Sequence, residues 1–382
     1  MHLCTSVKKQ EGEEGESRLE MSLRLKMKRV HLPISFFVGC FVTLAGVYFL
    51  QHTGWCSVPK ETNGESKTAV SKIVGNTPST AHLKHITVML IWLWPFGLTT
   101  DLNVCYKVNI EGCLLTADRT VYSTADAVVF HHVDIRSDLS NLPTNPRPPH
   151  QKWIWMNWEA PSYSRRIPGL NNLFNMTINY LQDSDINTPY GYIVPNKGEE
   201  NFVLPKKDKL VCWIVSNWNE NLARVKYFNE LKKHIDIFTF GRAFGKGLPK
   251  NAQLPVMASC KFYLAFENSI HKDYITEKFY NSLTMGTVPV VLGPPRKNYE
   301  SIVQGDAFIH VDDFKSPLEM AEHLKLMDKN EKMYLKYFAW HGHYKMKQPH
   351  FWPEYVCLAC DHMRRNTEYK ALTNIESWFW NS

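Results

Sequence analysis

The densest group of polar side chains in the sequence lies in residues 266–278, FENSIHKDYITEK. The apolar run before it predicts a buried strand, and the residues that follow predict a helix. In open parallel sheets, ligands bind at the carboxyl ends of the strands, where a helix start also offers free N–H groups. Lys278 in the first helical turn has the wrong charge for the helix dipole, and a bound anion would remove that penalty. The pattern predicts an anion site. The alternative is a solvated turn in which Glu277 and Lys278 are ordinary surface residues.

A second basic residue occupies the equivalent place after the preceding strand. Arg224 lies in WNENLARVKYF (218–228), at the start of a helix that opens on the same edge of the sheet. Its guanidinium can bind two phosphate oxygens at once, which a Lys ammonium cannot. Together with Lys278, Arg224 predicts a cradle for a diphosphate. Taken alone, an arginine in such a position is more often an exposed surface residue.

In the first half of the chain, the strand-like sequence WIWMNWEAP (153–161) contains Glu159 at its end. A carboxylate at this place, beside Trp155 and Trp158, loses hydration and becomes a better proton acceptor. Glu159 is therefore the candidate general base. The alternative is that it only caps or turns the chain before Pro161.

Two patterns could hold a metal ion. Asp183-Ser-Asp185 is a D-x-D sequence, a type that binds Mn²⁺ in other sugar-nucleotide enzymes but is frequent by chance. His131 and His132 end an expected strand, with no carboxylate or third His at ligand spacing. We therefore expect no metal site. Neither G-x-G-x-x-G nor G-x-x-x-x-G-K-[ST] occurs, so the common dinucleotide and Walker phosphate loops are excluded.

The elements that must position these residues are short apolar runs that alternate with helical stretches after residue 85. The runs predict buried strands of a mostly parallel sheet. The polar segment 196–208 divides the pattern, so we expect an α/β fold with two Rossmann-like domains and a cleft between them, at 85–204 and 205–340. The expected strands are 85–94, 127–132, 152–158, 210–216, 236–240, 261–266 and 288–292, and the expected helices are 221–234, 274–285, 319–329 and 331–340.

Residues 30–50, VHLPISFFVGCFVTLAGVYFL, are the one apolar stretch long enough to span a bilayer, with a helix length of about 31 Å. Basic residues precede it and uncharged residues follow, which keeps residues 1–29 in the cytosol and sends the rest across the membrane. A cleaved signal peptide is the alternative, but the run is long for one and no A-x-A site follows. We expect a single-pass type II anchor and a flexible, polar stem at 51–84.

Charge and cysteine usage limit the partners and the compartment. The chain carries 44 Lys and Arg against 37 Asp and Glu, a net charge of +7 without long runs of one sign, so nucleic acid is not an expected partner. Six of the nine cysteines lie beyond the stem, and an even number in an oxidising lumen predicts three disulfides among fifteen connectivities. Cys357 and Cys360 could instead form half a zinc site or a redox pair, but no second ligand pair stands at suitable spacing. Asn175-Met-Thr177 is an N-glycosylation sequon.

Three stretches resemble the α1,3-fucosyltransferases of glycosyltransferase family 10, the Lewis-antigen enzymes of the secretory pathway. They are FENSIHKDYITEKFYNSLTMGTVPVVLG (266–293), VCWIVSNWNENLARVKYFNEL (211–231) and QKWIWMNWEAPS (151–162), and the similarity covers nearly all of residues 85–381. The resemblance implies a two-domain GT-B fold. It also implies an inverting transfer of L-fucose from GDP-β-L-fucose to O3 of GlcNAc in Galβ1,4GlcNAc (type 2) glycans, which makes Lewis x-type structures. The family needs no metal or other cofactor for this chemistry.

The resemblance also assigns roles to single residues. Glu159 would take the proton of the acceptor hydroxyl, and Arg224 and Lys278 would stabilise charge on the GDP diphosphate. Residues 341–382 would return to the first domain. The implied disulfides are Cys105–Cys357, Cys113–Cys360 and Cys212–Cys260, and the further implied donor contacts are Ser216, Asn217, Tyr263, Asn268, Tyr274 and Glu277, with Tyr190, Ile214 and Leu248.

Two departures from the family pattern concern the acceptor. Leu98 stands where relatives have Gln, and Val133 follows His-His where they have Arg or Trp. An apolar side chain cannot make the hydrogen bonds of Gln or Arg, so we expect acceptor choice to depend on these two positions. The alternative is that both side chains only pack in the core. The expected partners are lactosamine acceptors on glycoproteins and glycolipids. We expect the protein to be anchored in the Golgi membrane with its catalytic domain in the lumen. A homodimer is an alternative to a monomer.

Two other functions compete with this interpretation. A catalytically silent, membrane-anchored glycan-binding protein on the same fold would need to lose the base or the diphosphate clamp, yet Glu159, Arg224 and Lys278 are all present. The other alternative is a transferase that uses another sugar nucleotide as donor. Comparing GDP and UDP as competitors of the donor would distinguish it.

Overall fold

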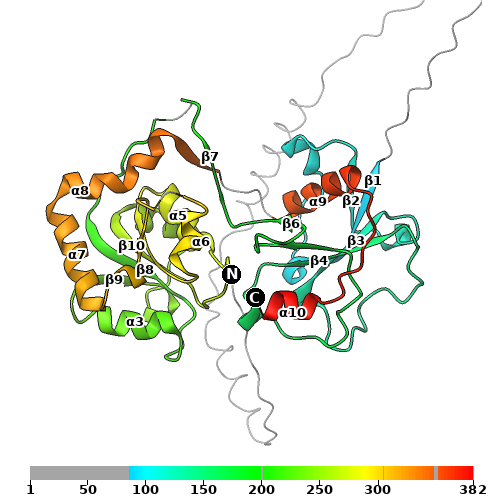
Figure 1. Cartoon of the computed structure of the whole chain (residues 1–382), viewed down its shortest axis with the longest axis horizontal. Coiled ribbons are helices and arrows are strands. Elements are labelled where there is room, and N and C mark those ends of the chain that lie inside the picture. The colour runs from blue at the N-terminus through cyan, green and yellow to red at the C-terminus, as the bar shows by residue number, and fades with distance from the viewer. Residues whose placement is uncertain (1–85, 199–200, 304, 348–351, 382) are drawn as a thin grey trace, which may run out of the picture. The chain divides into compact units, whose positions relative to one another are not determined.

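The computed structural model describes residues 86–198, 201–303, 305–347 and 352–381. These residues contain two parallel sheets with helices on their faces and one antiparallel two-stranded ribbon (Figure 1). We call the first sheet with its helices the first half, and the second sheet with its helices the second half. The expectation of an α/β fold built on mostly parallel sheets is confirmed.

The expected cytosolic tail (1–29), membrane anchor (30–50) and stem (51–84) lie outside the described residues. Among the residues that are described, none of the helices has the length and apolar character needed to cross a bilayer.

The first sheet has six parallel strands in the order β2-β1-β3-β4-β5-β6. Side chains alternate between the two faces of a strand, and both faces of this sheet are buried. In β3, Val128 and Phe130 belong to one apolar cluster, whereas Ala127 and Val129 belong to another. Burial on both faces explains why the strands are continuous apolar runs. The strands are β1 (Thr87–Leu93), β2 (Cys113–Thr116), β3 (Ala127–His131), β4 (Lys152–Asn157), β5 (Met176–Asn179) and β6 (Ile186–Asn187).

The last two helices of the chain, α9 (Pro353–Arg365) and α10 (Ile375–Trp380), cover the two faces of this sheet. Val356 of α9 packs in the cluster of Ala127, and Phe379 of α10 packs in that of Phe130. Figure 1 shows the two helices on either side of the strands. Helices α9 and α10 therefore belong to the first half, while the return of the whole segment 341–382 stays a prediction.

Three disulfides are present: Cys105–Cys357, Cys113–Cys360 and Cys212–Cys260. These are the pairings that the family resemblance implied. The first two join α9 to β2 and to the segment before it, across sequence separations of 252 and 247 residues.

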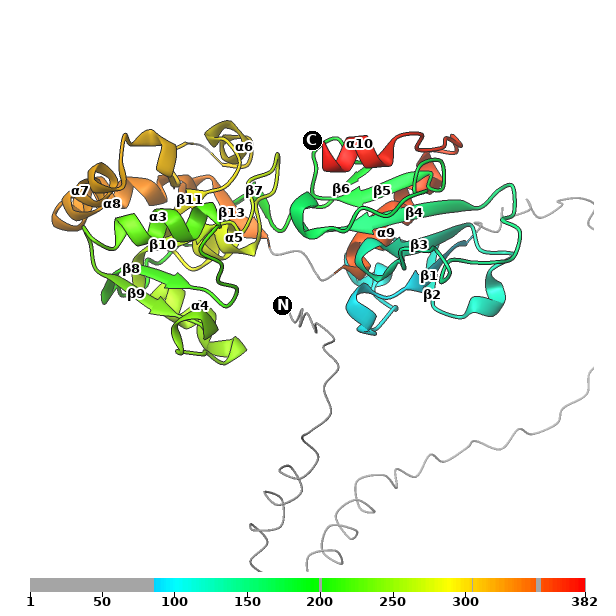
Figure 2. The ribbon, with the colours of Figure 1, turned by 90° about the horizontal axis from the view of Figure 1, so that it is seen from below.

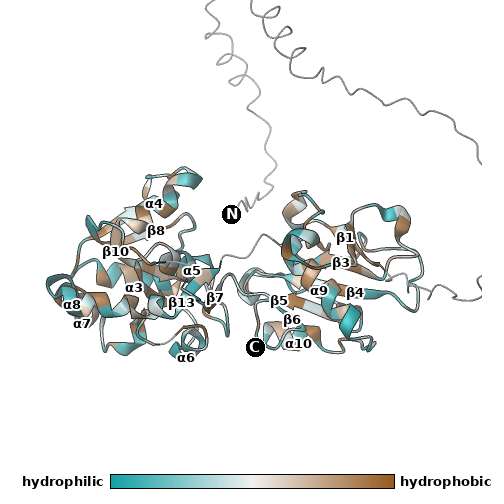
Figure 3. Cartoon of the chain, turned by 90° about the horizontal axis from the view of Figure 1, so that it is seen from above, coloured by the Kyte–Doolittle hydropathy of each residue, from teal (hydrophilic) through white to brown (hydrophobic). Residues whose placement is uncertain are grey.

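The second sheet has five parallel strands in the order β12-β11-β10-β8-β9. Helices α3, α7 and α8 pack on one of its faces, and α4, α5 and α6 pack on the other (Figure 2). Hydrophobic residues gather in the strands, while the outer helices such as α7 and α8 present polar residues (Figure 3). The elements are β8 (Lys209–Ile214), α3 (Ala223–Leu231), β9 (Ile237–Phe240), α4 (Gln253–Ala258), β10 (Cys260–Phe266), α5 (Glu277–Thr284), β11 (Val288–Leu292), α6 (Arg296–Glu300), β12 (Ile309–His310), α7 (Pro317–Lys329) and α8 (Glu331–Leu335).

Two segments connect the halves, and they pair as an antiparallel ribbon of β7 (Tyr192–Pro195) and β13 (Tyr344–Lys347). The polar segment 196–208 follows β7, so the break in the sequence pattern coincides with the passage from one sheet to the other. The domain limits at 204 and 340 themselves stay a prediction.

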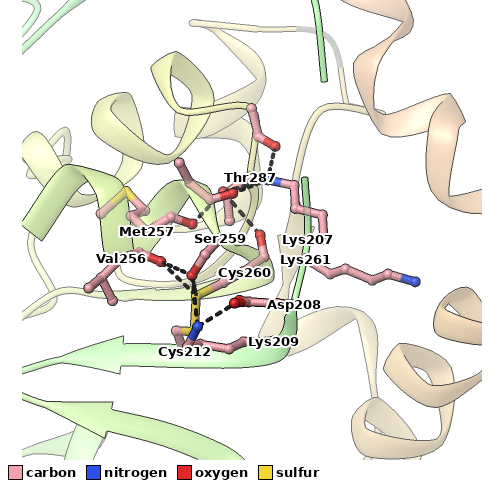
Figure 4. The surroundings of a disulfide bond; sticks show 12 residues. Lys207, Asp208, Lys209, Cys212, Val256, Met257, Ser259, Cys260, Lys261 and Thr287 are labelled. Atoms are coloured by element: carbon pink, nitrogen blue, oxygen red, sulfur yellow. Dashed lines mark hydrogen bonds and ion pairs between the residues drawn. A yellow bond between two sulfur atoms is a disulfide. The ribbon is translucent and has the colours of Figure 1, made fainter. Parts of the chain in front are cut away.

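Lys207 fixes the end of this connecting segment to the second half, beside the Cys212–Cys260 disulfide (Figure 4). Its ammonium donates to the carbonyls of Ala258 (2.8 Å) and Gly286 (2.6 Å), at the C-terminal ends of α4 and α5. Carbonyls at helix ends lack partners within the helix and carry partial negative charge, so a cation stabilises them. Burial lowers the pKa of Lys207 to about 8.

The folded structure contradicts the expected glycosylation of Asn175. Asn175 is 1% exposed, at the start of β5. Its Nδ2 donates to the Lys370 carbonyl (2.6 Å), and its Oδ1 accepts from the Trp153 backbone N–H (2.8 Å). A glycan on Nδ2 would have to replace a buried hydrogen bond, so the sequon is a structural element of the core.

We therefore expect peptide-N-glycosidase to leave the mass of the purified protein unchanged. Asn175→Ala should lower the free energy of unfolding by about 2–4 kcal/mol, because it leaves buried donor and acceptor groups without partners. Asn251→Ala, in the 3₁₀ segment Lys250–Ala252 before α4, changes an exposed residue, so it is the control and should change stability by less than about 0.5 kcal/mol. A mass loss of one glycan on digestion would contradict the buried assignment.

Candidate active site

A buried ionic cluster occupies the carboxyl end of β10 and the start of α5. Glu267 directly follows β10, and its side chain is fully buried. Its carboxylate accepts hydrogen bonds from the Thr276 backbone N–H (2.8 Å), the Thr276 hydroxyl (2.9 Å) and the Lys278 ammonium (3.0 Å). Lys278 also donates to the Thr276 hydroxyl (2.6 Å) and to Glu277 Oε1 (3.3 Å). We call Glu267, Thr276, Glu277 and Lys278 the Glu267 cluster.

The charges of this cluster stabilise one another. Burial raises the pKa of Glu267, and the Lys278 ammonium offsets part of that rise. Burial alone would lower the pKa of Lys278, but the carboxylates of Glu267 and Glu277 more than compensate and raise it. Lys278 therefore keeps its positive charge, and its side chain remains 22% exposed, which leaves it accessible to a ligand.

Arg224, in the first turn of α3, lies near this cluster. It is 4% exposed, and its Nη2 donates to the Asn217 carbonyl (2.5 Å). Burial lowers its pKa, while Tyr163 of the first half and Glu267 act in the opposite direction. Its Nε is buried without a hydrogen-bond partner, as is Oδ1 of Asn268. Such atoms are rare and costly in folded proteins, so a ligand with phosphate or hydroxyl groups fits here.

A cavity of about 470 Å³ adjoins these residues. Hydrogen bonds join the two halves at the wall of this cavity. Ser162 Oγ of the first half lies 2.8 Å from Ser269 Oγ and 3.0 Å from His271 Nε2 of the second half. Its lining combines the residues after Glu159, the start of α3 and the end of β10: Ser162, Tyr163, Asn221, Leu222, Ala223, Glu267, Asn268, Ser269, Ile270 and His271.

Glu159 lies two residues after β4, half-buried, on the first half. Burial raises the pKa of the Tyr274 phenol well above its usual value, and the carboxylates of Glu267, Glu159 and Glu277 add to that rise. Tyr274 in turn packs edge-on against Tyr180 of the first half, with ring centroids 5.2 Å apart. The charges of the candidate base and of the Glu267 cluster therefore both act on Tyr274.

The other predicted donor residues lie on several different elements. Tyr190 donates to the Trp158 carbonyl (2.5 Å), and burial raises its pKa, with Tyr274 and Glu159 adding to the rise. Tyr263 is buried in β10, and burial raises its pKa, which the Lys278 ammonium offsets in part. Ile214 ends β8, and the exposed Ser216 and Asn217 follow it. Leu248 is half-buried in the loop before α4, and none of these contacts includes it.

The residues considered as metal ligands have other partners. Asp185 accepts from the Thr177 backbone N–H (2.9 Å) and pairs with Lys370 (2.6 Å). Asp183 pairs with Lys272 (3.4 Å). Within the ranges that the structure describes, no group of three His, Cys, Asp or Glu side chains is arranged to hold a metal ion.

His131 and His132 also have structural partners. His131 Nδ1 lies 2.6 Å from Asp134 Oδ2. His132 Nε2 donates to the Arg165 carbonyl (2.9 Å), and its Nδ1 accepts from Trp155 Nε1 (3.2 Å), which fits a neutral imidazole. Burial lowers the pKa of His132 to about 4.

His132 therefore predicts a loss of stability in acid. Between pH 6.5 and 4 the unfolded chain binds a proton on this residue and the folded chain does not, so the free energy of unfolding should fall as pH falls, by up to about 3 kcal/mol. His341, whose pKa burial also lowers to about 4, adds its own share. Denaturant titrations of His132→Gln should show a smaller fall over this range. An equal fall in the variant would contradict the assignment.

Leu98 and Val133 are exposed, at 47% and 37%. They belong to two short 3₁₀ segments that contact each other, Pro95–Gly97 with its C-cap Leu98 and His132–Asp134. Phe96 of the first segment donates its backbone N–H to Asp134 Oδ2 (2.8 Å) in the second. The alternative that both side chains are core residues therefore does not hold.

Glu267 and Thr276 were not among the predicted site residues. A signal for Glu267 was present, since a carboxylate directly after a seven-residue apolar strand is costly to bury unless it has a partner. The distance between Glu267 and Lys278 cannot be inferred from the sequence. The turn between β10 and α5 brings the Lys278 ammonium to 3.0 Å from the Glu267 carboxylate.

Two parallel α/β sheets with basic side chains at their strand ends are typical of enzymes that bind nucleotides or nucleotide sugars. Sequence models of two families define the class further. The model for the glycosyltransferase family 10 (fucosyltransferase) C-terminal region matches residues 204–378, and that for the fucosyltransferase N-terminal region matches residues 84–191.

The chain belongs to the glycosyltransferase family 10 fucosyltransferases, which confirms the resemblance, and it is a glycosyltransferase. It is 49% identical to the 4-galactosyl-N-acetylglucosaminide 3-alpha-L-fucosyltransferase 9 of Rattus norvegicus and 48% identical to that of Homo sapiens, over 92% of this chain and 98% of each relative. It is 42% identical to a 3-galactosyl-N-acetylglucosaminide 4-alpha-L-fucosyltransferase of Pongo pygmaeus, over 78% of this chain and 82% of that one. A solved α1,3-fucosyltransferase with GDP-fucose is similar at 15% identity and a TM-score of 0.49, over 80% of this chain and 95% of that one.

Proposed function

We propose that this protein is an inverting α1,3-fucosyltransferase of GT-B architecture that transfers L-fucose from GDP-β-L-fucose to O3 of GlcNAc in Galβ1,4GlcNAc glycans. The observation that carries the proposal is the 48–49% identity, over 92% of the chain, to relatives named as 3-alpha-L-fucosyltransferases of 4-galactosyl-N-acetylglucosaminides. The buried cations at the strand ends support it, because the leaving group of this reaction is a diphosphate.

In the proposed reaction, Glu159 accepts the proton of the acceptor O3 hydroxyl. The oxygen forms a bond to C1 of fucose while the bond from C1 to the diphosphate breaks, so the β-linked donor gives an α-linked product. Arg224 and Lys278 stabilise the negative charge that develops on GDP, and donors of this kind are effective because they are fixed in place and partly desolvated. Both are buried or half-buried here. We propose that this chemistry needs no bound metal.

Incubation of residues 85–382 with GDP-fucose and a panel of type 1 and type 2 acceptors tests the proposal. Transfer to O3 of type 2 acceptors, with inhibition by GDP and not by UDP, is the expected result. Binding of glycans without transfer would support the silent glycan-binding alternative, which the names of the relatives do not support. Inhibition by UDP would indicate a different donor.

We further propose that the protein is a single-pass type II protein of the Golgi membrane with a luminal catalytic domain. The apolar run 30–50 and the basic residues before it support this topology. The three disulfides agree with an oxidising compartment. Protease protection in intact microsomes tests the topology: residues 85–382 should be protected, and a protein cleaved within them would have the opposite orientation.

Acceptor choice should depend on Leu98 and Val133. Their exposure on two contacting segments supports a role in sugar recognition, and neither can form the hydrogen bonds of Gln or Arg. The double variant Leu98→Gln, Val133→Arg should change the ratio of kcat/KM between type 2 and type 1 acceptors several-fold, with an unchanged KM for GDP-fucose. An unchanged ratio in the folded variant would place acceptor specificity elsewhere.

A further inference from the structure

We propose that Glu267 is a positioning residue, which together with Thr276 holds the Lys278 ammonium in the one place where it can bind the donor diphosphate. This inference rests on the proposed function and assigns to Glu267 a role that acts through Lys278. It starts from the contacts of Lys278, whose three N–H donors have three oxygen partners, on Glu267, Thr276 and Glu277.

The position of Glu267 is fixed from all sides. Its backbone N–H donates to the Leu292 carbonyl (2.8 Å), which continues the pairing of β10 with β11. The Thr276 backbone N–H and hydroxyl hold its carboxylate. A side chain at Gly293 would come within 3.2 Å of Glu267 Cγ and 2.4 Å of the Tyr299 hydroxyl, so only glycine leaves room for this arrangement.

A lysine has four flexible methylene groups, and its ammonium loses hydration when it is buried. Without Glu267, Lys278 would keep only Glu277 as a charged partner, and that side chain is 55% exposed. Exposed ion pairs contribute little and hold neither partner in one geometry. Glu267, whose side chain is fully buried, is therefore the partner that can fix the ammonium.

A second effect of Glu267 is on the protonation of Lys278. Glu267 and Glu277 raise the pKa of Lys278, while burial and the Arg224 guanidinium lower it. The phenols of Tyr263, Tyr274 and Tyr299 also interact electrostatically with Glu267 or Lys278. When Glu267 is neutral, the lowering influences prevail, and Lys278 should lose its proton at a pH where the unmodified protein keeps it.

The test measures kcat/KM for GDP-fucose from pH 6.5 to 9.5 with the full-length chain in detergent. Glu267→Gln should reduce kcat/KM about 10- to 100-fold at pH 7. It should also lose at least three-fold more activity than the wild type between pH 7.5 and 9.5. In the double variant Glu267→Gln, Lys278→Arg this additional loss should disappear, because a guanidinium stays protonated throughout.

Asp328→Asn is the matched control, since it makes the same chemical change in a Lys ion pair of the second half, that of Lys261 and Asp328 (2.7 Å). It should keep the wild-type profile. A folded Glu267→Gln variant with wild-type activity, or one whose loss is the same at every pH, would overturn the proposal.

If Glu267→Gln does not fold, the Thr276→Val variant tests the proposal instead. It keeps both charges and removes the hydroxyl between them, so kcat/KM should fall about three- to ten-fold with no added pH dependence. Wild-type activity in this variant would overturn the proposal. The same assay separates the two hypotheses: absence of transfer by the wild type rejects the proposed function, whereas active wild type with unaffected variants rejects only the role of Glu267.

Discussion

Transfer by the Glu159→Gln variant is expected to fall below about one-thousandth of the wild-type kcat, with GDP bound within a few-fold of the wild-type affinity. Gln has the size of Glu but cannot accept the proton of the acceptor hydroxyl, and general base catalysis contributes about 10²–10⁴ in rate. The base acts on the acceptor, so its loss leaves donor binding nearly unchanged. Radiolabelled transfer and calorimetric titration with GDP measure the two quantities.

Asp183→Asn is the control for this substitution. Asp183 is exposed, pairs only with Lys272 among the contacts described above, and belongs to the D-x-D sequence. The variant should keep activity within about two-fold. A Glu159→Gln enzyme with half of the wild-type kcat would remove Glu159 from the role of base.

Lys278→Ala and Arg224→Ala should each reduce kcat/KM for GDP-fucose about 10- to 1000-fold. Each removes a charge-assisted contact to the diphosphate, worth about 1.5–3 kcal/mol or somewhat more when the charge develops in the transition state. Lys278→Ala also leaves the carboxylate of Glu267 buried without its cation. A thermal melt must therefore accompany the kinetics.

Lys297→Ala is the matched control, because Lys297 is an exposed lysine in the first turn of α6. It should be fully active. Addition of Mn²⁺ should not restore either site variant, and the wild type should remain active in EDTA. Strict dependence on a metal would reopen the role of Asp183 and Asp185.

Most of the strands that the sequence predicted are buried on both faces, with the partly exposed edge strand β9 as the exception. The runs at β1, β3, β4, β8, β10 and β11 are continuous and apolar, so their periodicity is clear, and the structure confirms them within one or two residues. The strands it did not predict, such as β2, β6 and β12, have two to four residues and lie at or near sheet edges. Helices α9 and α10 were not predicted, and their residues are buried by a sheet more than 150 residues earlier in the chain.

The site could be predicted in part for a similar reason. Strand ends and helix starts are local features, so Glu159, Arg224 and Lys278 could be recognised as candidates from their neighbours in the sequence. Contacts between residues distant in sequence could not be predicted in this way. The packing of Tyr274 against Tyr180, and the effect of the Glu159 carboxylate on the pKa of Tyr274, depend on how the two halves meet.

The connection of α9 to β2 has a consequence for how the protein is made. Cys105 and Cys113 leave the ribosome about 250 residues before their partners, which at 5–20 residues per second is a delay of about 12–50 seconds. Cys212 and Cys260, which are 48 residues apart, are both synthesised within that interval. These four thiols are thus available for pairing before the correct partners of Cys105 and Cys113 exist. The chain should therefore depend on thiol exchange during biogenesis, and any nonsense mutation that removes α9 would leave the first sheet without its closing helix.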